Sequence, residues 1–300
     1  MLNGSNDVLS PQAASPAARP DRPAVLLIGD FRHRDFSAAV QWLQANTRVR
    51  CVPEMSAALA SLETALPAVI LFAQARPGQF SPRQVEQIHA RSPLSRLVVL
   101  LGSWCEGETR TGRPWPGVVR VFWHQWHCRL ASELAACRID ANPPVPPAWG
   151  AWRLPRTAST SELLACTVAG PWPRGRGLVV IRARLLGDYE ALRDACTAGG
   201  YASLWDPSVV PAVSSRPAAA LFSAVSGSPD ELVELAELVR RHEPAPVIVL
   251  LDFLRRNDHQ QAIAAGAAAV LAKPFLVPDL LWNLDHHIRN TRDDRAGQAA

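Results

Sequence analysis

The sequence lacks most marks of a secreted or membrane-spanning protein. Its 6 cysteines are scattered through 300 residues without regular spacing, unlike the dense disulfide framework of a small secreted domain, and they favour reduced thiols in a cytosolic setting. No apolar run approaches the roughly 20 residues that a membrane helix needs. The beginning of the chain lacks the basic-then-apolar order of a signal peptide. We therefore expect a soluble, cytoplasmic protein with no membrane association.

A strong net charge is absent as well. Lys and Arg number 31 against 27 Asp and Glu, and the resulting net charge of +4 is too mild and too dispersed to indicate a nucleic-acid-binding protein. Apolar residues, in contrast, are plentiful. At 48% hydrophobic residues over 300 positions, the chain is long enough for two domains that each bury a core.

The distribution of proline, glycine and tryptophan predicts the domain boundaries. A Pro- and Trp-rich stretch over residues 141–175 cannot hold regular structure for long, so we interpret it as a linker. It separates a first domain at 23–140 from a second at 176–292. The terminal segments, 1–22 and 293–300, are expected to be disordered tails.

The two halves repeat the same pattern. Short β-branched apolar runs alternate with longer amphipathic stretches, which is typical of βα units on a parallel sheet. The five strands expected in the first half are Val25–Ile28, Val49–Val52, Val69–Phe72, Leu97–Leu101 and Val118–Phe122. Those expected in the second half are Leu178–Ile181, Ala202–Trp205, Ala219–Phe222, Val247–Leu251 and Ala268–Leu271.

A helix-start signal recurs at the same place in both halves. After the third expected strand, Ser81–Gln84 and Ser228–Glu231 each place a hydroxyl N-cap, a proline at the first helical position and Gln or Glu at the third. Both patterns predict a capping box, and an amphipathic helix follows each one.

The end of the second half resembles the receiver domain of bacterial response regulators, the CheY-like family. Gly266–Phe275 follows the family's Gly-Ala-x-x-x-Leu-x-Lys-Pro-Phe pattern, and Pro246–Leu250 resembles its fourth strand. The resemblance covers about 177–292 and extends, more weakly, to about 22–140. It implies an α/β fold with two doubly wound, five-stranded parallel-sheet domains of flavodoxin type in tandem.

The resemblance also implies where phosphotransfer residues should lie. The family uses an acidic pair for Mg²⁺, an aspartate phosphoacceptor, a hydroxyl residue and a lysine. In the second domain Arg182 and Ala183 stand at the acidic pair, Ser223 at the phosphoacceptor and Leu251 at the hydroxyl, so that only Lys273 is retained.

The first domain departs from the pattern in a different way. Asp30 remains at the acidic pair, but Ala73 stands at the phosphoacceptor and Leu101 at the hydroxyl. His124 aligns with the lysine, and Trp126 aligns with the phenylalanine that follows it. With no carboxylate as acceptor, Mg²⁺-dependent phosphorylation is implausible in either domain, and we interpret both as degenerate pseudo-receivers.

The segment after the fourth strand of the first domain is rich in tryptophan and arginine. Loops after the fourth and fifth strands meet at the carboxyl edge of such a sheet, so we expect these side chains to gather there. The candidate binding residues are Trp104, Glu106, Glu108, Arg110, Arg113, Trp115, Arg120, Trp123, His124 and Trp126.

Several roles are open for this segment. Trp and Arg are the residues that anchor protein interfaces, which favours a partner-binding surface. Arg110, Arg113 and Arg120 could instead meet the phosphate of a small anion. A third hypothesis is a zinc site from Cys105, His124, His127 and Cys128. In the fourth, the tryptophans pack the loop onto the domain and the arginines pair with the two glutamates.

The sequence offers no enzyme signature, since neither a Gly-x-Ser-x-Gly elbow nor a Walker-type phosphate loop is present. We therefore predict a non-catalytic signalling protein without catalytic residues, cofactor or resident metal. It would bind protein partners through the fourth helix, fifth strand and fifth helix of each domain together with the Trp-rich loop, and a homodimer is an additional option. The alternative is a sensor that binds a nucleotide or other anion at the carboxyl edge of the first domain.

Overall fold

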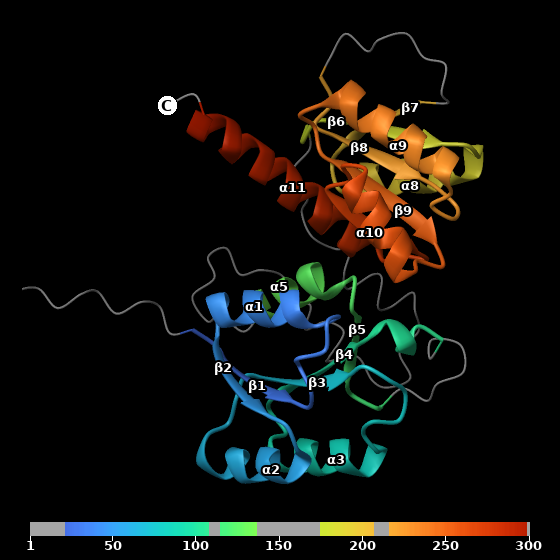
Figure 1. Cartoon of the computed structure of the whole chain (residues 1–300). Helices are drawn as coiled ribbons and strands as arrows, with labels where there is room; N and C mark the ends of the chain where they lie inside the picture. The colour runs from blue at the N-terminus through green and yellow to red at the C-terminus, as the bar shows by residue number, and fades with distance from the viewer. Residues whose placement is uncertain (1–21, 108–114, 137–174, 207–215, 299–300) are drawn as a thin grey trace, which may run out of the picture.

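The computed structural model describes residues 22–107, 115–136, 175–206 and 216–298, which form two parallel α/β domains (Figure 1). The first domain contains β1 (Ala24–Ile28), α1 (Ser37–Asn46), β2 (Arg48–Val52), α2 (Met55–Thr64), β3 (Val69–Gln74), α3 (Pro82–Arg91), β4 (Arg96–Leu101), the 3-10 turn η1 (Ser103–Cys105), β5 (Val119–Phe122) and α5 (Trp126–Ala136). The second contains β6 (Leu178–Ala183), α8 (Leu186–Ala198), β7 (Ala202–Trp205), β8 (Ala219–Ser223), α9 (Pro229–His242), β9 (Val247–Asp252), α10 (Arg256–Ala264), β10 (Ala269–Lys273) and α11 (Val277–Gln298).

Both sheets have the same strand order. The first runs β2-β1-β3-β4-β5, and the second, taken from its other edge, runs β7-β6-β8-β9-β10. Every pairing between neighbouring strands is parallel. This is the doubly wound order of flavodoxin and of receiver domains, which confirms the predicted tandem of receiver-like domains.

The apolar runs form the strands because they can be buried on both faces. All residues of β3, β4 and β8 are buried, as expected when helices cover both sides of a parallel sheet. Each of the ten expected runs coincides with a strand, although β10 begins at Ala269 and continues to Lys273.

The predicted capping boxes are confirmed. Gln84 donates its backbone N–H to Ser81 Oγ at 3.3 Å, and Ser81 donates its own to Gln84 Oε1 at 2.8 Å. In the second domain the corresponding bonds join Glu231 and Ser228 at 3.3 and 3.2 Å. These bonds satisfy backbone donors that the first turn of a helix leaves without a helical partner.

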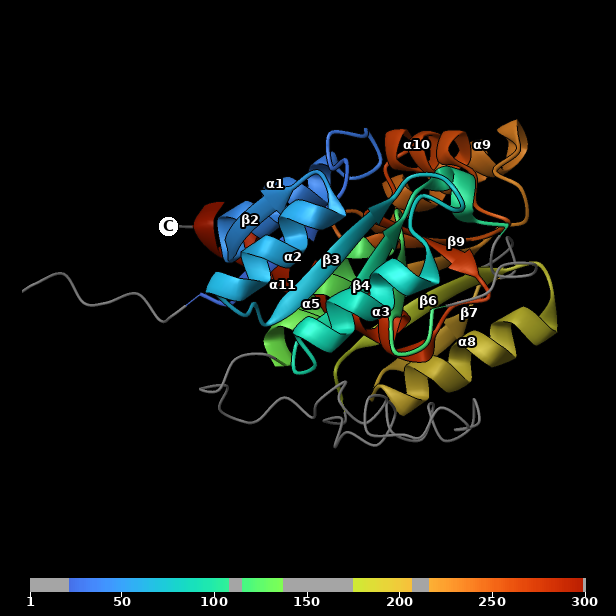
Figure 2. The same ribbon diagram turned by 90° about the horizontal axis from the view of Figure 1, so that it is seen from below.

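Among the described residues, two helices cover each face of each sheet. In the first domain α1 and α5 pack on one face and α2 and α3 on the other, where α2 and α3 lie in front of the sheet in Figure 2. In the second domain α8 and α11 cover one face and α9 and α10 the other. Among the described residues between β4 and Trp115, the structure contains only the short turn η1. The described residues between β7 and β8 contain no helix.

The domains contact each other through the α1 and α5 side of the first sheet and through α10 and α11, which lie on opposite faces of the second sheet. Figure 1 shows α1 and α5 on the side of the first sheet that faces the second domain, with α10 and α11 opposite. Arg129 of α5 forms an ion pair with Asp279 of α11 at 2.8 Å. The His127 ring lies 4.9 Å from Trp282 and 4.8 Å from His286, measured between ring centroids.

Two expectations at the chain ends have different outcomes. A disordered tail was expected at 293–300, but α11 continues to Gln298. The expected tail at 1–22 and the linker at 141–175 lie almost wholly outside the described residues, so these boundaries stay predictions. None of the described helices is long and apolar enough to cross a membrane.

Candidate functional site

Four polar side chains meet at the carboxyl edge of the second sheet. Ser223 ends β8, Asp252 ends β9, Lys273 ends β10 and Asp188 lies in the first turn of α8. Ser223 Oγ donates to Asp188 Oδ2 at 2.7 Å, and Lys273 Nζ donates to Ser223 Oγ at 3.2 Å. Lys273 Nζ also lies 2.9 Å from Asp252 Oδ1 and 3.7 Å from Asp188 Oδ2.

The lysine ammonium occupies the centre of this group. It is a compact cation with three donors, and it faces two carboxylates and a hydroxyl oxygen. Ser223 therefore directs its hydroxyl proton at Asp188, and Lys273 contacts both carboxylates and the serine oxygen. Ser223, Asp188, Asp252 and Lys273 are called the second-domain pocket below.

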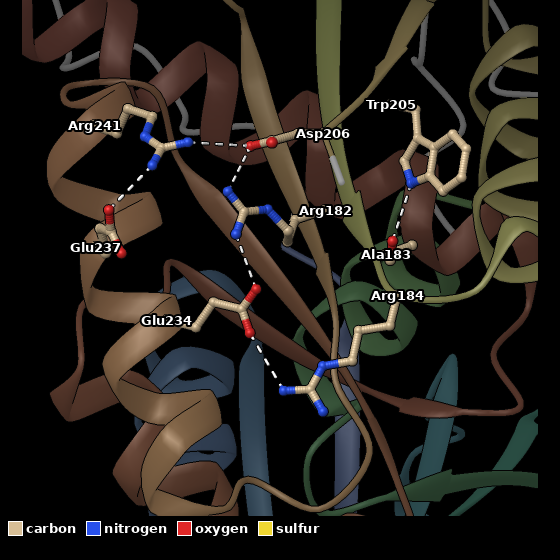
Figure 3. Close-up of polar contacts among 8 residues, drawn as sticks. All are labelled: Arg182, Ala183, Arg184, Trp205, Asp206, Glu234, Glu237 and Arg241. Atoms are coloured by element: carbon tan, nitrogen blue, oxygen red, sulfur yellow. Dashed lines mark hydrogen bonds and ion pairs between the residues drawn. The ribbon is translucent and has the colours of Figure 1, made fainter. Parts of the chain in front are cut away.

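Arg182 pairs instead with residues at the end of β7 and on α9 (Figure 3). It lies on the face of β6 that carries Val180, and its guanidinium donates to Asp206 Oδ2 at 2.8 Å and to Glu234 Oε1 at 2.9 Å. Desolvation by burial would lower the pKa of Arg182, but its hydrogen bonds to Asp206 and Glu234 raise that pKa above the ordinary value. A buried ion-pair network stands where receivers have an acidic pair.

The same ion-pair network connects three elements of the second domain. Arg241 of α9 reaches Asp206 at 3.5 Å and Glu237 at 3.1 Å, and Arg184 lies 3.4 Å from Glu234 (Figure 3). At the end of β6, Trp205 Nε1 donates to the Ala183 carbonyl at 3.0 Å. The network connects β6, the end of β7 and α9, and its role is structural.

The carboxyl edge of the first sheet is filled by an aromatic side chain. A side chain at Gly29 would meet the Phe80 ring at 2.9 Å and the Ala73 carbonyl oxygen at 3.2 Å. Asp30 is exposed, and its carboxylate accepts the backbone N–H of Arg32 at 3.0 Å. Leu101 is buried on the α2 and α3 side of the sheet. Asp30 therefore caps a local turn, and the space above Ala73 is occupied.

The tryptophans of the first domain do not gather at one place, contrary to our expectation. Trp115 packs against Phe72 and Phe80 on the α2 and α3 face, at centroid distances of 5.8 and 6.2 Å. Trp126 packs on the opposite face, 6.0 Å from Trp42. The burial of aromatic rings in two separate cores explains this division.

The remaining candidates of this segment make separate contacts. Trp104 is 67% exposed and lies under the Arg76 guanidinium at 5.6 Å. Trp123 Nε1 donates to Glu106 at 2.7 Å, and burial raises the pKa of that carboxyl. The Arg120 guanidinium lies 5.9 Å from the Phe122 ring centroid.

Three further candidates, Glu108, Arg110 and Arg113, lie outside the described residues.

The residues proposed for zinc have other contacts. Cys105 Sγ donates to the Gln74 carbonyl at 3.3 Å, and Cys128 Sγ donates to the Gln125 carbonyl at 3.2 Å. Burial raises the pKa of Cys128 to about 12, which disfavours the thiolate that a metal requires. Within the described ranges, no three His, Cys, Asp or Glu side chains are grouped so that they could hold a metal ion.

Exposed apolar side chains surround the second-domain pocket. They follow β10, β9, β8 and β6, which are consecutive neighbours in the sheet. These residues, called the apolar rim below, are Leu276, Phe253, Val225, Leu185 and Leu186, with exposed fractions of 39, 70, 55, 67 and 53%. The carboxyl ends of parallel strands meet at one edge, so the rim is a row of apolar loops at a position where ligands bind in this fold class.

One expected partner surface is not free. In the second domain the fourth-helix, fifth-strand and fifth-helix face corresponds to α10, β10 and α11. The helices of this face contact the first domain through Arg256, His259, Asp279, Trp282 and His286. The tandem arrangement itself therefore covers a large part of that face.

Sequence reasoning missed the two carboxylates of the second-domain pocket. Asp252 lies one position after Leu251, which is buried in the α9 and α10 core. Asp188 lies on α8 and has no counterpart in the family's pattern. A signal for Asp252 was available in the sequence. Asp252 ends an apolar strand, and it is the residue that pairs with Lys273 on the neighbouring strand.

Comparison with known proteins yields structural matches only. No family model and no curated protein matches the chain. Among solved structures, an orphan response regulator of H. pylori shares 16% identity and covers 39% of this chain and 100% of its own, with a TM-score of 0.32. A response regulator receiver protein from Pseudoalteromonas atlantica shares 17% identity over 38% of this chain and 98% of its own, with a TM-score of 0.32.

A third match is the signal receiver domain of a modulated diguanylate cyclase from Desulfovibrio desulfuricans G20. It shares 20% identity over 39% of this chain and 98% of its own, with a TM-score of 0.33. Similarity at this level concerns the fold alone. The roles of individual residues in this chain rest on the contacts described above.

Proposed function

We propose that this chain is a non-catalytic regulatory protein of a cytoplasmic signalling pathway, which binds a protein partner without being phosphorylated. The second-domain pocket carries this proposal. The ammonium of Lys273 already neutralises part of the charge of Asp188 and Asp252, and the phosphoacceptor position holds a serine that donates to a carboxylate. The two carboxylates of the pocket, Asp188 and Asp252, both lie within ion-pair distance of Lys273, and neither stands at the phosphoacceptor position.

The apolar rim supports binding of a protein. Exposed apolar side chains in a row are costly to leave in water, and their burial in a contact with another protein removes this cost. The polar pocket below the rim would provide hydrogen-bonding groups at the centre of the contact. In the second domain this edge replaces the α10 and α11 face as the proposed partner surface.

Phosphorylation is tested by incubating the full chain with acetyl phosphate and Mg²⁺ and measuring its intact mass. We expect the unmodified mass, while an active receiver domain treated in parallel gains one phosphoryl group. A stoichiometric adduct that disappears in the Ser223→Ala or Asp252→Asn variant would overturn the proposal.

Partner binding is tested with matched substitutions of exposed apolar residues. Phe253→Ser and Leu186→Ser alter the rim, whereas Leu94→Ser removes a side chain that is 94% exposed in the first domain. In affinity capture from the native cell, a partner that is recovered with wild type and with Leu94→Ser should be lost with both rim variants. Recovery that is equal with all four proteins would contradict the assignment of the surface. Sedimentation of the purified chain shows whether the partner is a second copy.

A further inference from the structure

A cavity of about 420 Å³ lies between the two domains. Its lining comes from the turn after β1, from the segment after β5 and from α10 of the second domain. The volume falls within the range of about 300–1,000 Å³ that is typical of small-molecule sites. Because residues from both domains line it, the cavity exists only when the domains are docked.

Positive charge exceeds negative charge in this cavity. Arg34 and Arg256 both line it, together with one carboxylate, that of Asp35. The Asp35 side chain is fully buried, and it accepts hydrogen bonds from Ser103 N at 2.8 Å, from Ser103 Oγ at 2.9 Å and from the Arg256 guanidinium.

The negative charge of Asp35 thus balances the positive charge of the Arg256 guanidinium. Within the described residues no carboxylate forms an ion pair with Arg34, which leaves an excess positive charge at the mouth of the cavity.

Aromatic rings line the wall beside these arginines. Trp123 and Trp126 both line the cavity, and the Arg256 guanidinium lies 5.7 Å from the Trp123 ring centroid. The His259 ring lies 5.2 Å from Trp123. Trp123 is only 6% exposed, so a flat aromatic group placed here would meet mainly the half-buried Trp126 ring and the guanidinium planes.

His124 adds an unpaired polar atom. Its Nδ1 is buried and has no hydrogen-bond partner, and His124 lines the same cavity. A buried ring nitrogen that lacks a hydrogen-bond partner is unfavourable, because it has lost its contact with water. A ligand that presents a hydroxyl or amine to this atom would recover that interaction.

We propose that this interdomain cavity binds a nucleoside monophosphate or a similar small aromatic phosphate. The phosphate would contact Arg34 and Arg256, and the base would stack on the Trp123 and Trp126 side. The binding site uses none of the second-domain pocket or rim residues. It is therefore independent of the partner surface proposed above, and it adds a ligand that favours the docked arrangement of the two domains.

The test titrates the full chain with AMP and GMP while tryptophan fluorescence and thermal stability are recorded. Inorganic phosphate, ribose 5-phosphate and adenosine serve as probes that carry only part of the recognised group. We expect saturable quenching and a higher midpoint of unfolding with a mononucleotide, and weaker effects with each partial probe, because a ligand that binds only the folded state stabilises it.

Charge substitutions locate the site without disturbing the core. Arg34→Gln should weaken mononucleotide binding about tenfold or more, since it removes a charge-assisted contact. Arg32→Gln, on the same exposed turn, should leave it unchanged. Ile263 lines the cavity and is 41% exposed, so Ile263→Glu should weaken binding and Ile263→Lys should preserve or strengthen it.

Two results would overturn the inference: no saturable response to either mononucleotide, or a response that is the same in Arg34→Gln, Ile263→Glu and wild type. Neither result affects the phosphorylation and partner-binding experiments, which report on the second domain alone. A failure here is thus distinguishable from a failure of the proposed function.

Discussion

Phe253 combines an exposed aromatic ring with a left-handed backbone. Its φ is 47°, and 70% of the residue is exposed. This conformation is rare for a bulky side chain, and it costs roughly 1–2 kcal/mol per residue relative to the right-handed form. A position that keeps such a residue in the apolar rim is better explained by binding than by folding, because strained positions concentrate at functional sites.

This strain leads to a prediction about stability. Phe253→Asn should raise the free energy of unfolding by about 1 kcal/mol, because asparagine tolerates the left-handed region and exposes less apolar surface. Urea denaturation of the two proteins measures the change. Leu94→Asn, at another highly exposed position, should leave stability within about 0.5 kcal/mol of wild type. A clear loss of stability in Phe253→Asn would show that the ring packs on the domain.

Single residues were predictable from sequence only where a family pattern applies. Lys273 was placed at the carboxyl edge by the Lys-Pro-Phe pattern, and the structure puts it there. Asp188 and Arg256 follow no pattern, and their contacts depend on how distant elements pack. The direction of Arg182, toward α9, follows from the alternation of strand faces but could not be inferred before its partners were known.

At the scale of elements, the buried network of Arg182 connects β6, the end of β7 and α9 in the second domain. Asp206 and Glu234 each offer a carboxylate that is mostly shielded from water, with exposed side-chain fractions of 6 and 19%. Removing the cation would leave both carboxylates without their main partner.

Arg182→Met should therefore lower the free energy of unfolding by about 3–5 kcal/mol, the usual cost of breaking one side of a buried ion pair. Arg184→Met is the matched control, because Arg184 is 59% exposed and makes a single contact to Glu234 in Figure 3. Its cost should stay below about 1 kcal/mol. Equal effects of the two substitutions in chemical denaturation would refute the assigned role of the network.

Elements were predictable from the sequence to a greater degree than sites. The strands were found because each is a short apolar run that must be buried on both faces, and α3 and α9 because their capping boxes are local. The four tryptophans of the segment after β4 were expected together, whereas the structure packs Trp126 and Trp115 on two separate cores and leaves Trp104 exposed. Local patterns specify where an element begins, whereas tertiary packing decides which face a long loop covers.

At the scale of the whole molecule, histidines lie between the domains. Burial, together with the positive charge of neighbouring histidines, lowers the pKa of His127 and of His287 to about 4, from an ordinary value of 6.5. Burial and Arg289 also lower the pKa of His286. Neutral rings of α5 and α11 are therefore part of the docked state.

The stability of the docked state should depend on pH. These folded-state pKa values are depressed, so the unfolded chain binds protons that the folded chain does not, and stability falls as the pH drops below about 6.5 towards about 4. Unfolding measured in denaturant at pH 7.5 and at pH 5 should show this loss. The loss should shrink in His127→Phe and persist in His89→Gln, which alters a histidine of α3 on the far face of the first sheet. An identical loss in both variants would place the effect elsewhere.

The ion pair between Arg129 and Asp279 joins domains that belong to one polypeptide. Contact within a single chain occurs at an effective concentration that the connecting segment sets and that dilution of the protein does not lower. A competitor for the α10 and α11 face must therefore bind much more tightly than the first domain does, or arrive after a ligand or proton has weakened the docking. Because the first domain is always present at this effective concentration, it limits the binding of other proteins to the α10 and α11 face.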